Sequence, residues 1–281
     1  MKLLSNNLYI VSTPIGNLED ITLRAINVLK KSDIILCEDT RRSLKLLNHF
    51  DIKKKLISYH KFNEKKKILN IIEYINQGKI LSLISDAGTP LLSDPGRLLV
   101  NECIKKNISV TPIPGVSSIT SAMSISGFKD QFLFYGFLPK TENELEKVLA
   151  TLSQNLFALI FFIPSLKINF YLKKFKKYFS GRKLLIAKEI TKIHECFFRE
   201  EIDNIKMFKN PVKGELTLIV SQKDFVTKKK VIDEDKIVNK AKKYLKRYSL
   251  KDTVDLISDS EKINKKFIYK ICLNVKNEKN N

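Results

Sequence analysis

Four sequence signatures are missing from this chain of 281 residues, and their absence disfavours three classes of enzyme. No G-x-G-x-x-G follows the first apolar segment, and neither G-x-x-x-x-G-K-[ST], G-x-S-x-G nor H-E-x-x-H occurs anywhere. A dinucleotide-dependent oxidoreductase, a P-loop NTPase and an α/β-hydrolase are therefore disfavoured.

Cysteines and long apolar runs are also scarce. The four cysteines form no C-x-x-C pair and have no histidine cluster of zinc-ligand spacing nearby, so we expect reduced thiols and no metal site. The longest apolar run, Leu156 to Ile163, is too short to cross a bilayer, and residues 1–7 lack the apolar core of a signal peptide. These features predict a cytoplasmic protein with no membrane partner.

Arginine is rare in a chain that is otherwise strongly basic. The formal net charge is +21, yet only seven of the 51 basic residues are arginine. Abundant lysine, asparagine and isoleucine are typical of an AT-rich coding sequence, and arginine is the residue suited to bidentate phosphate recognition. Most lysine runs are therefore expected to be solvated surface, although so large a charge still favours association with RNA.

The first 127 residues repeat a cycle of strand, loop and helix. Short apolar strands are expected at residues 8–11, 34–37, 56–58, 80–84 and 108–110, and each is followed by a loop and a helical pattern. This alternation predicts a mostly parallel sheet with helices on both faces. Seven of the nine glycines lie before residue 137, so the loops suited to a ligand are concentrated in this half.

A change of pattern after residue 127 predicts a second α/β domain over residues 128–222. Its strands are expected at 156–163, 184–188, 195–199 and 215–220. From residue 223 the chain becomes highly charged, with Lys228 to Lys230 followed by three helical patterns. The predicted fold class is α/β, with two α/β domains and a small C-terminal helical appendage over residues 223–281.

The stretch Ser85 to Gly96 is the most constrained loop of the first domain. It holds two glycines, two prolines and two aspartates between a strand and a helix, and Asp94 followed by Pro95 predicts an N-cap with proline at the first helical position. Loops at the carboxyl ends of strands are where open α/β sheets bind small molecules. The alternative is a well-capped turn with no ligand.

Three other tight loops come after predicted strands: Pro14–Asn17, Glu38–Arg42 and Pro114–Ser117. Together with Ser85–Pro90 they suit a compact ligand that has a nucleoside and a charged end.

The motifs in these loops resemble those of a known family. They are Val11-Ser12-Thr13-Pro14-Ile15-Gly16-Asn17-Leu18-Glu19-Asp20-Ile21-Thr22, Glu38-Asp39-Thr40-Arg41, Ser85-Asp86-Ala87-Gly88-Thr89-Pro90, Pro112-Ile113-Pro114-Gly115, Phe134-Tyr135-Gly136-Phe137-Leu138-Pro139, Thr191-Lys192-Ile193-His194-Glu195 and Pro211-Val212-Lys213-Gly214-Glu215. In number and order they are similar to the ribosomal RNA small subunit methyltransferase I family, which belongs to the tetrapyrrole methylase-like (class III) methyltransferases. The resemblance covers residues 8 to 221.

The resemblance implies a homodimer whose two α/β domains hold S-adenosylmethionine in the cleft between them. It implies methyl transfer to the ribose 2′-hydroxyl of a cytidine in small-subunit (16S) ribosomal RNA, with that RNA or the 30S subunit as partner. It places the cofactor against Pro14, Gly16, Asn17, Asp86, Ala87, Gly88, Thr89, Pro114, Gly115 and Ser117.

Methylation of a hydroxyl benefits from a proton acceptor. The candidate catalytic groups near the expected cleft are Asp39, Asp86, Glu189 and His194. The alternative for each is structural, since Asp39 and Asp86 can hold their own loops as Asx turns.

RNA contact is assigned to Arg41, Arg42, Lys140, Lys167 and Lys192. The arginine pair is favoured because arginine is so rare in this chain. The alternative is that the pair neutralises Glu38 and Asp39.

The chain departs from its relatives at one point. Where they carry a run of glutamate, serine, proline, histidine and arginine, this sequence has Ile163-Pro164-Ser165-Leu166-Lys167. The loss leaves a catalytically weak RNA-binding ribosome assembly factor open. A separate alternative is a methyltransferase acting on a tetrapyrrole or another small molecule, which the abundant lysine and the helical tail disfavour.

Overall fold

The computed structural model describes residues 6–223, 234–261 and 263–277. Contacts divide the chain into a large unit, Met1–Asp224, and a C-terminal unit, Phe225–Asn281. The expected lysine run Lys228–Lys230 lies outside the described residues.

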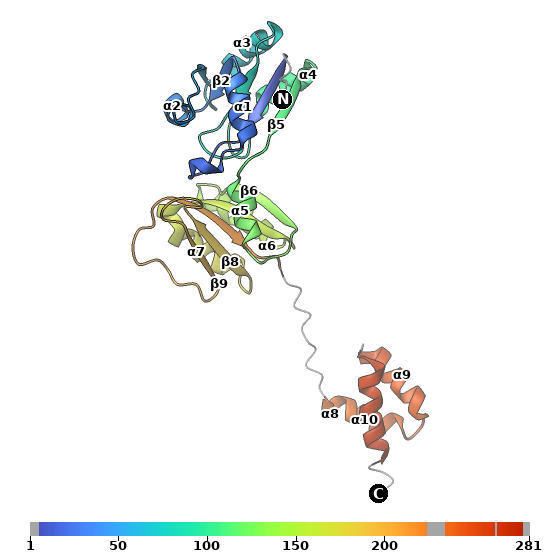
Figure 1. Cartoon of the computed structure of the whole chain (residues 1–281). Coiled ribbons are helices and arrows are strands. Elements are labelled where there is room, and N and C mark those ends of the chain that lie inside the picture. Colours follow the sequence, from blue (N-terminus) through green and yellow to red (C-terminus); the bar gives the residue numbers. More distant parts are fainter. Residues whose placement is uncertain (1–5, 224–233, 262, 278–281) are drawn as a thin grey trace. The chain divides into compact units, whose positions relative to one another are not determined.

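The large unit begins with a five-stranded sheet (Figure 1). Its strands are β1 (Asn7–Val11), β2 (Ile34–Cys37), β3 (Lys55–Ser58), β4 (Leu81–Leu83) and β5 (Ser109–Ile113). Their order is β3-β2-β4-β1-β5, and every pair is parallel, which confirms the expected parallel sheet. The loops after β1 and β4 therefore emerge side by side at one edge.

Strand β5 is longer than the sequence predicted. The prediction ended it at residue 110, whereas Thr111 to Ile113 continue the pairing with Tyr9 to Val11. Pro112 is tolerated because β5 is an edge strand, where a missing backbone N–H leaves no partner unsatisfied.

Helices cover both faces of this sheet, as expected. They are α1 (Leu23–Lys31), α2 (Thr40–His49), α3 (Glu64–Asn76) and α4 (Arg97–Lys105), with a short 3₁₀ turn, η1 (Leu18–Asp20), before α1. Alternate residues of β1 enter different cores: Leu8 packs with residues of α3 and α4, whereas Tyr9 packs with residues of α1 and α2. The sheet is thus buried on both sides.

A second, mixed sheet begins after residue 127. Its strands are β6 (Phe132–Phe137), β7 (Ala158–Pro164), β8 (Lys183–Lys188), β9 (Cys196–Glu201) and β10 (Glu215–Val220), in the order β6-β7-β10-β8-β9. Only the β6–β7 pair is parallel among these strands. Helices α6 (Glu142–Ser153) and α7 (Ile168–Tyr178), the latter preceded by η2 (Ser165–Lys167), pack into one core of this sheet.

The other core of the second sheet is closed by α5 (Ser118–Ser124). Ile119 and Ala122 of this helix pack with Ile160, Leu185 and Ile219. Helix α5 thus precedes residue 127 in sequence but packs against strands of the second sheet, and the domain division at 127 stays a prediction.

The C-terminal unit contains α8 (Glu234–Tyr244), α9 (Leu250–Glu261) and α10 (Lys265–Asn277). Ile237, Ile257, Ile268 and Cys272 form its own apolar core, so the expected helical appendage is present. Across the described ranges of the whole chain, none of the helices combines the length and the apolar character needed to cross a membrane.

Candidate functional site

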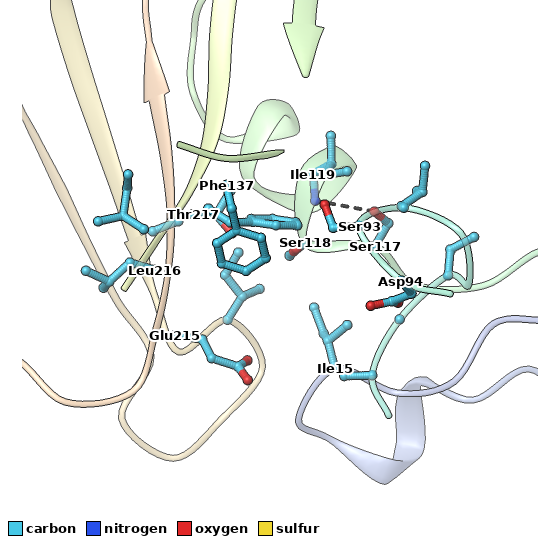
Figure 2. Close-up of a pocket in the computed structure, with 18 of the residues that line it drawn as sticks. Ile15, Ser93, Asp94, Ser117, Ser118, Ile119, Phe137, Glu215, Leu216 and Thr217 are labelled. Carbon is cyan, nitrogen blue, oxygen red and sulfur yellow. Dashed lines mark hydrogen bonds between the residues drawn. The ribbon is translucent and has the colours of Figure 1, made fainter. Parts of the chain in front are cut away.

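A cavity of about 340 Å³ lies between the loops of the first sheet and the second sheet (Figure 2). The first wall comes from the loops after β1, β4 and β5 and from the start of α5, and consists of Ile15, Ala87, Gly88, Thr89, Leu92, Ser93, Asp94, Ser117, Ser118 and Ile119. The second wall is more apolar, and consists of Phe137, Phe162, Ile163, Pro164, Ala187, Ile190, Gly214, Glu215, Leu216 and Thr217.

The loops after β1 and β4 are tied together by backbone hydrogen bonds. The Thr13 N–H donates to the Gly88 carbonyl at 2.9 Å, and the Gly88 N–H donates to the Thr13 carbonyl at 3.0 Å. Gly88 has a φ of +77°, and a Cβ there would lie 3.2 Å from the side chain of Ile15, so glycine suits both the turn and the close approach.

The loop after β5 joins this group. A Cβ on Gly115 would come within 2.8 Å of the Ser12 side chain, so the two loops are in direct contact. The Ser117 hydroxyl accepts a hydrogen bond from the Ile119 N–H and caps α5, as Figure 2 shows. The structure therefore brings three of the predicted ligand loops together at one sheet edge.

Of the residues expected to hold a cofactor, Ala87, Gly88, Thr89 and Ser117 line the cavity. Six others lie in the same loops but are not part of its wall: Pro14, Gly16, Asn17, Asp86, Pro114 and Gly115. Sequence reasoning assigned no site role to any residue of the second wall, because this wall is assembled from strands that are far apart in the chain and meet only through sheet pairing.

Residues Glu189–Lys192, which we call the clasp, connect the two walls. The Asn17 N–H donates to the Thr191 hydroxyl at 3.1 Å, and a Cβ on Gly16 would lie only 2.4 Å from the Cγ of Lys192. Glu189 and Thr191 both adopt positive φ values, +53° and +68°, which are uncommon for residues with side chains. The clasp thus rests directly on the loop after β1.

Two predicted site residues, Glu189 and Lys192, form the ion pairs of the clasp. The Lys192 ammonium lies 2.8 Å from Glu189 and 3.0 Å from Glu215, and the Glu215 N–H donates to Glu189 at 2.8 Å. Burial acts to raise the pKa of Glu189, but the bonds from Lys192 and from the Glu215 N–H hold that pKa below its ordinary value. Such a carboxylate is a weak proton acceptor.

Asp39 and Asp86 also have structural partners. Asp39 accepts from the Arg41 N–H at 2.9 Å, and the hydrogen bond from the Arg41 side chain lowers its pKa. Asp86 accepts from the Asp39 N–H at 3.1 Å and lies 3.4 Å from the Arg42 guanidinium. These contacts link the loops after β2 and β4.

The remaining predicted site residues lie on the surface. His194, Lys140 and Lys167 are exposed and do not line the cavity. Arg41 pairs with Asp39, as in the alternative to RNA contact, whereas Arg42 pairs with Asp86 and not with Glu38; both arginine side chains stay mostly exposed.

Asp94 is the ionisable residue that sequence reasoning misassigned. The prediction that it caps a helix is wrong, because α4 begins at Arg97 with Gly96 as N-cap at a φ of +130°. Its carboxylate instead points into the cavity (Figure 2). Burial, followed by the charge of Glu38, raises the pKa of Asp94 to about 6. The density of glycine and proline around it was the available sequence signal.

The chemistry of the two walls suits a nucleoside with a cationic centre. Phe137 is 59% exposed and its ring faces the cavity (Figure 2), and the ring of Phe162, 5.4 Å away between centroids, extends this apolar surface. Opposite them are the hydroxyls of Ser93, Ser117 and Ser118 and the carboxylate of Asp94. Within the described part of the chain, no group of three or more histidine, cysteine or acidic side chains is arranged to hold a metal ion.

Known proteins resemble this chain in sequence. Residues 7–206 match the family model described as Tetrapyrrole (Corrin/Porphyrin) Methylases. A Ribosomal RNA small subunit methyltransferase I from Rickettsia prowazekii is 44% identical over 222 residues, covering 78% of this chain and 79% of that protein. The protein of the same name from Thermotoga maritima is 42% identical over 221 residues, covering 77% of this chain and 99% of that protein.

The fold is also found among solved structures. A uroporphyrin-III C-methyltransferase from Thermus thermophilus, solved with S-adenyl homocysteine, matches with a TM-score of 0.54 at 15% identity and covers 76% of this chain and 97% of that one. The fold, the loop motifs and the identity to these relatives lead to one conclusion: the chain belongs to the tetrapyrrole methylase family, with the ribosomal RNA small subunit methyltransferase I proteins.

Proposed function

We propose that this protein transfers a methyl group from S-adenosylmethionine to the ribose 2′-hydroxyl of a cytidine in small-subunit ribosomal RNA. The observation that carries the proposal is the cavity itself. It is built from the loops whose motifs the family shares, in a chain 42–44% identical to proteins named as ribosomal RNA small subunit methyltransferase I.

The cavity fits S-adenosylmethionine in size and charge. Its volume of about 340 Å³ lies within the usual range of roughly 300–1,000 Å³ for small-molecule sites. The carboxylates of Asp94 and Glu215 in its walls complement a sulfonium and an ammonium group, while Phe137 and Phe162 offer apolar surface to an adenine. When bound, S-adenosylmethionine supplies the activated methyl group; the protein aligns the acceptor hydroxyl with it.

The RNA-binding surface is proposed to include the exposed side chains of Arg41, Arg42, Lys140 and Lys167. Lys192 fits this role less well, since its ammonium is engaged by Glu189 and Glu215. The net charge of +21 supports attraction to RNA at low salt.

The departure at Ile163 to Lys167 falls partly inside the cavity wall. Ile163 is buried and, with Pro164, lines the cavity, whereas Leu166 and Lys167 are exposed. The Ile163 side chain packs into the core formed with α6 and α7, so the chain has no proton acceptor at the position where the resemblance implies a carboxylate.

The direct test is methylation of small ribosomal subunits lacking this modification. We expect the purified protein and labelled S-adenosylmethionine to label small-subunit RNA, and ribose-methylation mapping to locate one cytidine. Labelling absent under conditions where the Thermotoga maritima relative succeeds would contradict the proposal. Activity on a porphyrin-type acceptor alone would indicate a small-molecule methyltransferase.

A calorimetric titration with S-adenosylmethionine separates the enzyme from an assembly factor. Binding is expected because the cavity walls are complete in this chain. RNA binding without cofactor binding would favour the catalytically weak assembly factor.

A homodimer and a cytoplasmic location complete the proposal. Both are supported by the family resemblance, and the second also by a substrate that is a ribosomal RNA. Light scattering on the full chain tests the first, because a monomeric mass would contradict it.

A further inference from the structure

The most exposed aromatic side chain in the described part of the chain is Phe62, of which 91% is accessible to solvent. It lies in Tyr59–Asn63, which we call the β3 turn because it joins β3 to α3. Burial of a phenylalanine ring stabilises a fold, so the folded protein gains almost no hydrophobic stabilisation from this ring. Single exposed apolar residues are common on protein surfaces, and a role for Phe62 has to come from its surroundings.

Hydrogen bonds fix the conformation of the β3 turn. The side chain of Asn63 accepts from the His60 N–H at 2.9 Å and donates to the Ser58 carbonyl at 3.2 Å. The Lys67 ammonium donates to the same carbonyl at 2.7 Å, and the Phe62 N–H donates to Nδ1 of His60 at 3.3 Å. Because the turn is ordered before a partner arrives, binding loses less entropy than it would with a flexible loop.

The β3 turn lies at the same sheet edge as the cavity. Strand β3 pairs with β2, and the Tyr59 N–H donates to the carbonyl of Cys37, the last residue of β2, at 2.7 Å. The loop after β2 is tied in turn to the loop after β4, because the Asp39 N–H donates to Asp86 at 3.1 Å. Ala87, the next residue, lines the cavity. Two strand spacings, about 10 Å, therefore separate the β3 turn from a loop of the first wall.

Basic side chains flank the β3 turn. Lys61 within it and Lys65 just after it are exposed, and so are Arg41 and Arg42 in the neighbouring loop after β2 and the start of α2. The acid between the two lysines, Glu64, is half-buried. Surfaces that bind single-stranded nucleic acid combine an accessible ring, on which a base stacks, with cations that contact phosphates. Lysine is depleted in the cores of protein–protein interfaces, so these neighbours favour RNA over a second copy of the chain.

We propose that Phe62 is a stacking platform for an unpaired base of the substrate RNA, close to the nucleotide that is methylated. The inference rests on the proposed methyl transfer and adds to it a contact that requires the RNA to be single-stranded at this point. The ring stacks on one base, while Lys61 and Arg41 contact the flanking phosphates. Because every base has a flat face, this contact selects an unpaired nucleotide and not a particular sequence.

Tryptophan fluorescence gives a direct readout, because the chain contains no tryptophan. In Phe62→Trp the indole occupies the stacking position. We expect a single-stranded RNA of about 12 cytidines to quench its fluorescence, and an RNA duplex of the same length to leave it unchanged. Ile104→Trp is the matched control, since Ile104 is also exposed but lies near the end of α4, shortly before β5 begins at the opposite edge of the sheet. Neither RNA should quench it.

Affinity measurements separate aromatic stacking from apolar contact. We expect Phe62→Ala and Phe62→Leu to bind small ribosomal subunits lacking the modification at least about fivefold more weakly than the wild type, and Phe62→Tyr to bind within about threefold. Leucine keeps apolar area but has no flat face, so it distinguishes a stacked base from an apolar partner. Phe62 does not line the cavity, so calorimetry should give the same affinity for S-adenosylmethionine in all of these proteins.

Three outcomes would overturn the inference. They are unquenched fluorescence of Phe62→Trp with the single-stranded RNA, a Phe62→Leu variant that binds the subunits like the wild type, and a Phe62→Ala variant whose mass in light scattering is lower than that of the wild type. The last would make the β3 turn a contact between copies of the chain. Failure of the proposed function is recognised separately, because the wild type would then not methylate the subunits, while the quenching experiment would still test Phe62.

Discussion

The carboxylate of Asp94 destabilises the folded protein at neutral pH, because burial and the nearby acidic groups Glu38 and Asp86 oppose its ionisation. Its pKa of about 6 in the folded state lies above the ordinary value of about 3.9 expected in the unfolded chain. Between these values the folded state binds more protons, so its stability falls as the pH rises through this window.

The variant Asp94→Asn is therefore expected to be more stable than the wild type. The gain is on the order of 2 kcal/mol in the free energy of unfolding at pH 7.5 and vanishes near pH 4, where the wild-type carboxyl is protonated. Urea unfolding of the large unit at the two pH values checks this. A variant less stable than the wild type at pH 7.5 would indicate that Asp94 supports the fold.

Residue-level patterns located the ligand loops but did not predict the backbone conformation and contacts of individual residues within them. The sequence Asp94-Pro95-Gly96 has the composition of a helix start, yet the positive φ of Gly96 moves the start of α4 to Arg97. That conformation depends on packing against Leu83 and Leu91, which no local pattern encodes. Lys192, which was predicted to contact RNA, has two acidic partners: Glu189 is three residues away, and Glu215 is distant in sequence.

At the scale of elements, the clasp depends on a close approach between two loops. Gly214 has a φ of +97°, and a Cβ there would lie 2.4 Å from the Glu189 Cδ. Gly181 is a matched control: it has a φ of +77°, but among the described residues other than Gly181 and its two chain neighbours, no atom lies within 4 Å of its Cβ position.

Alanine at these two glycines should have different effects. Gly181→Ala is expected to lower the free energy of unfolding by about 1 kcal/mol through backbone strain alone. Gly214→Ala is expected to lower it by about 2–3 kcal/mol and to weaken S-adenosylmethionine binding, because Glu189 must move and residue 214 lines the cavity. Urea unfolding and calorimetry measure both effects, and equal losses with unchanged binding would show that the clasp does not shape the site.

Most strands could be predicted from the sequence to within one or two residues. Alternation of apolar segments with helical patterns indicated the parallel sheet, and β2 and β10 have the predicted bounds. The orders β3-β2-β4-β1-β5 and β6-β7-β10-β8-β9 could not be predicted, because they depend on pairings between residues far apart in the chain.

At the scale of the whole molecule, the methylase fold and the C-terminal unit have separate apolar cores. The 221 matched residues of the Thermotoga maritima relative make up 99% of that protein, which leaves it almost nothing beyond the matched part. In that relative, the matched part makes up nearly the whole protein.

A fragment of residues 1–224 is expected to fold and to bind S-adenosylmethionine with an affinity within about threefold of the full chain. Its calorimetric melting temperature should match that of the large unit in the full chain within a few degrees, because separate cores unfold independently. Aggregation of the fragment, or loss of cofactor binding, would show that the C-terminal unit supports the site.

The packing of helix α5 affects how the chain folds during synthesis. During synthesis, Ile119 and Ala122 leave the ribosome well before Ile160, Leu185 and Ile219, the residues that cover them. The nascent chain therefore carries an uncovered apolar helix until β10 emerges, at residues 215–220, and the first sheet is already complete by then. We expect chaperones to bind the nascent chain while α5 is uncovered. When translation is arrested before residue 215, we expect α5 to be accessible to protease.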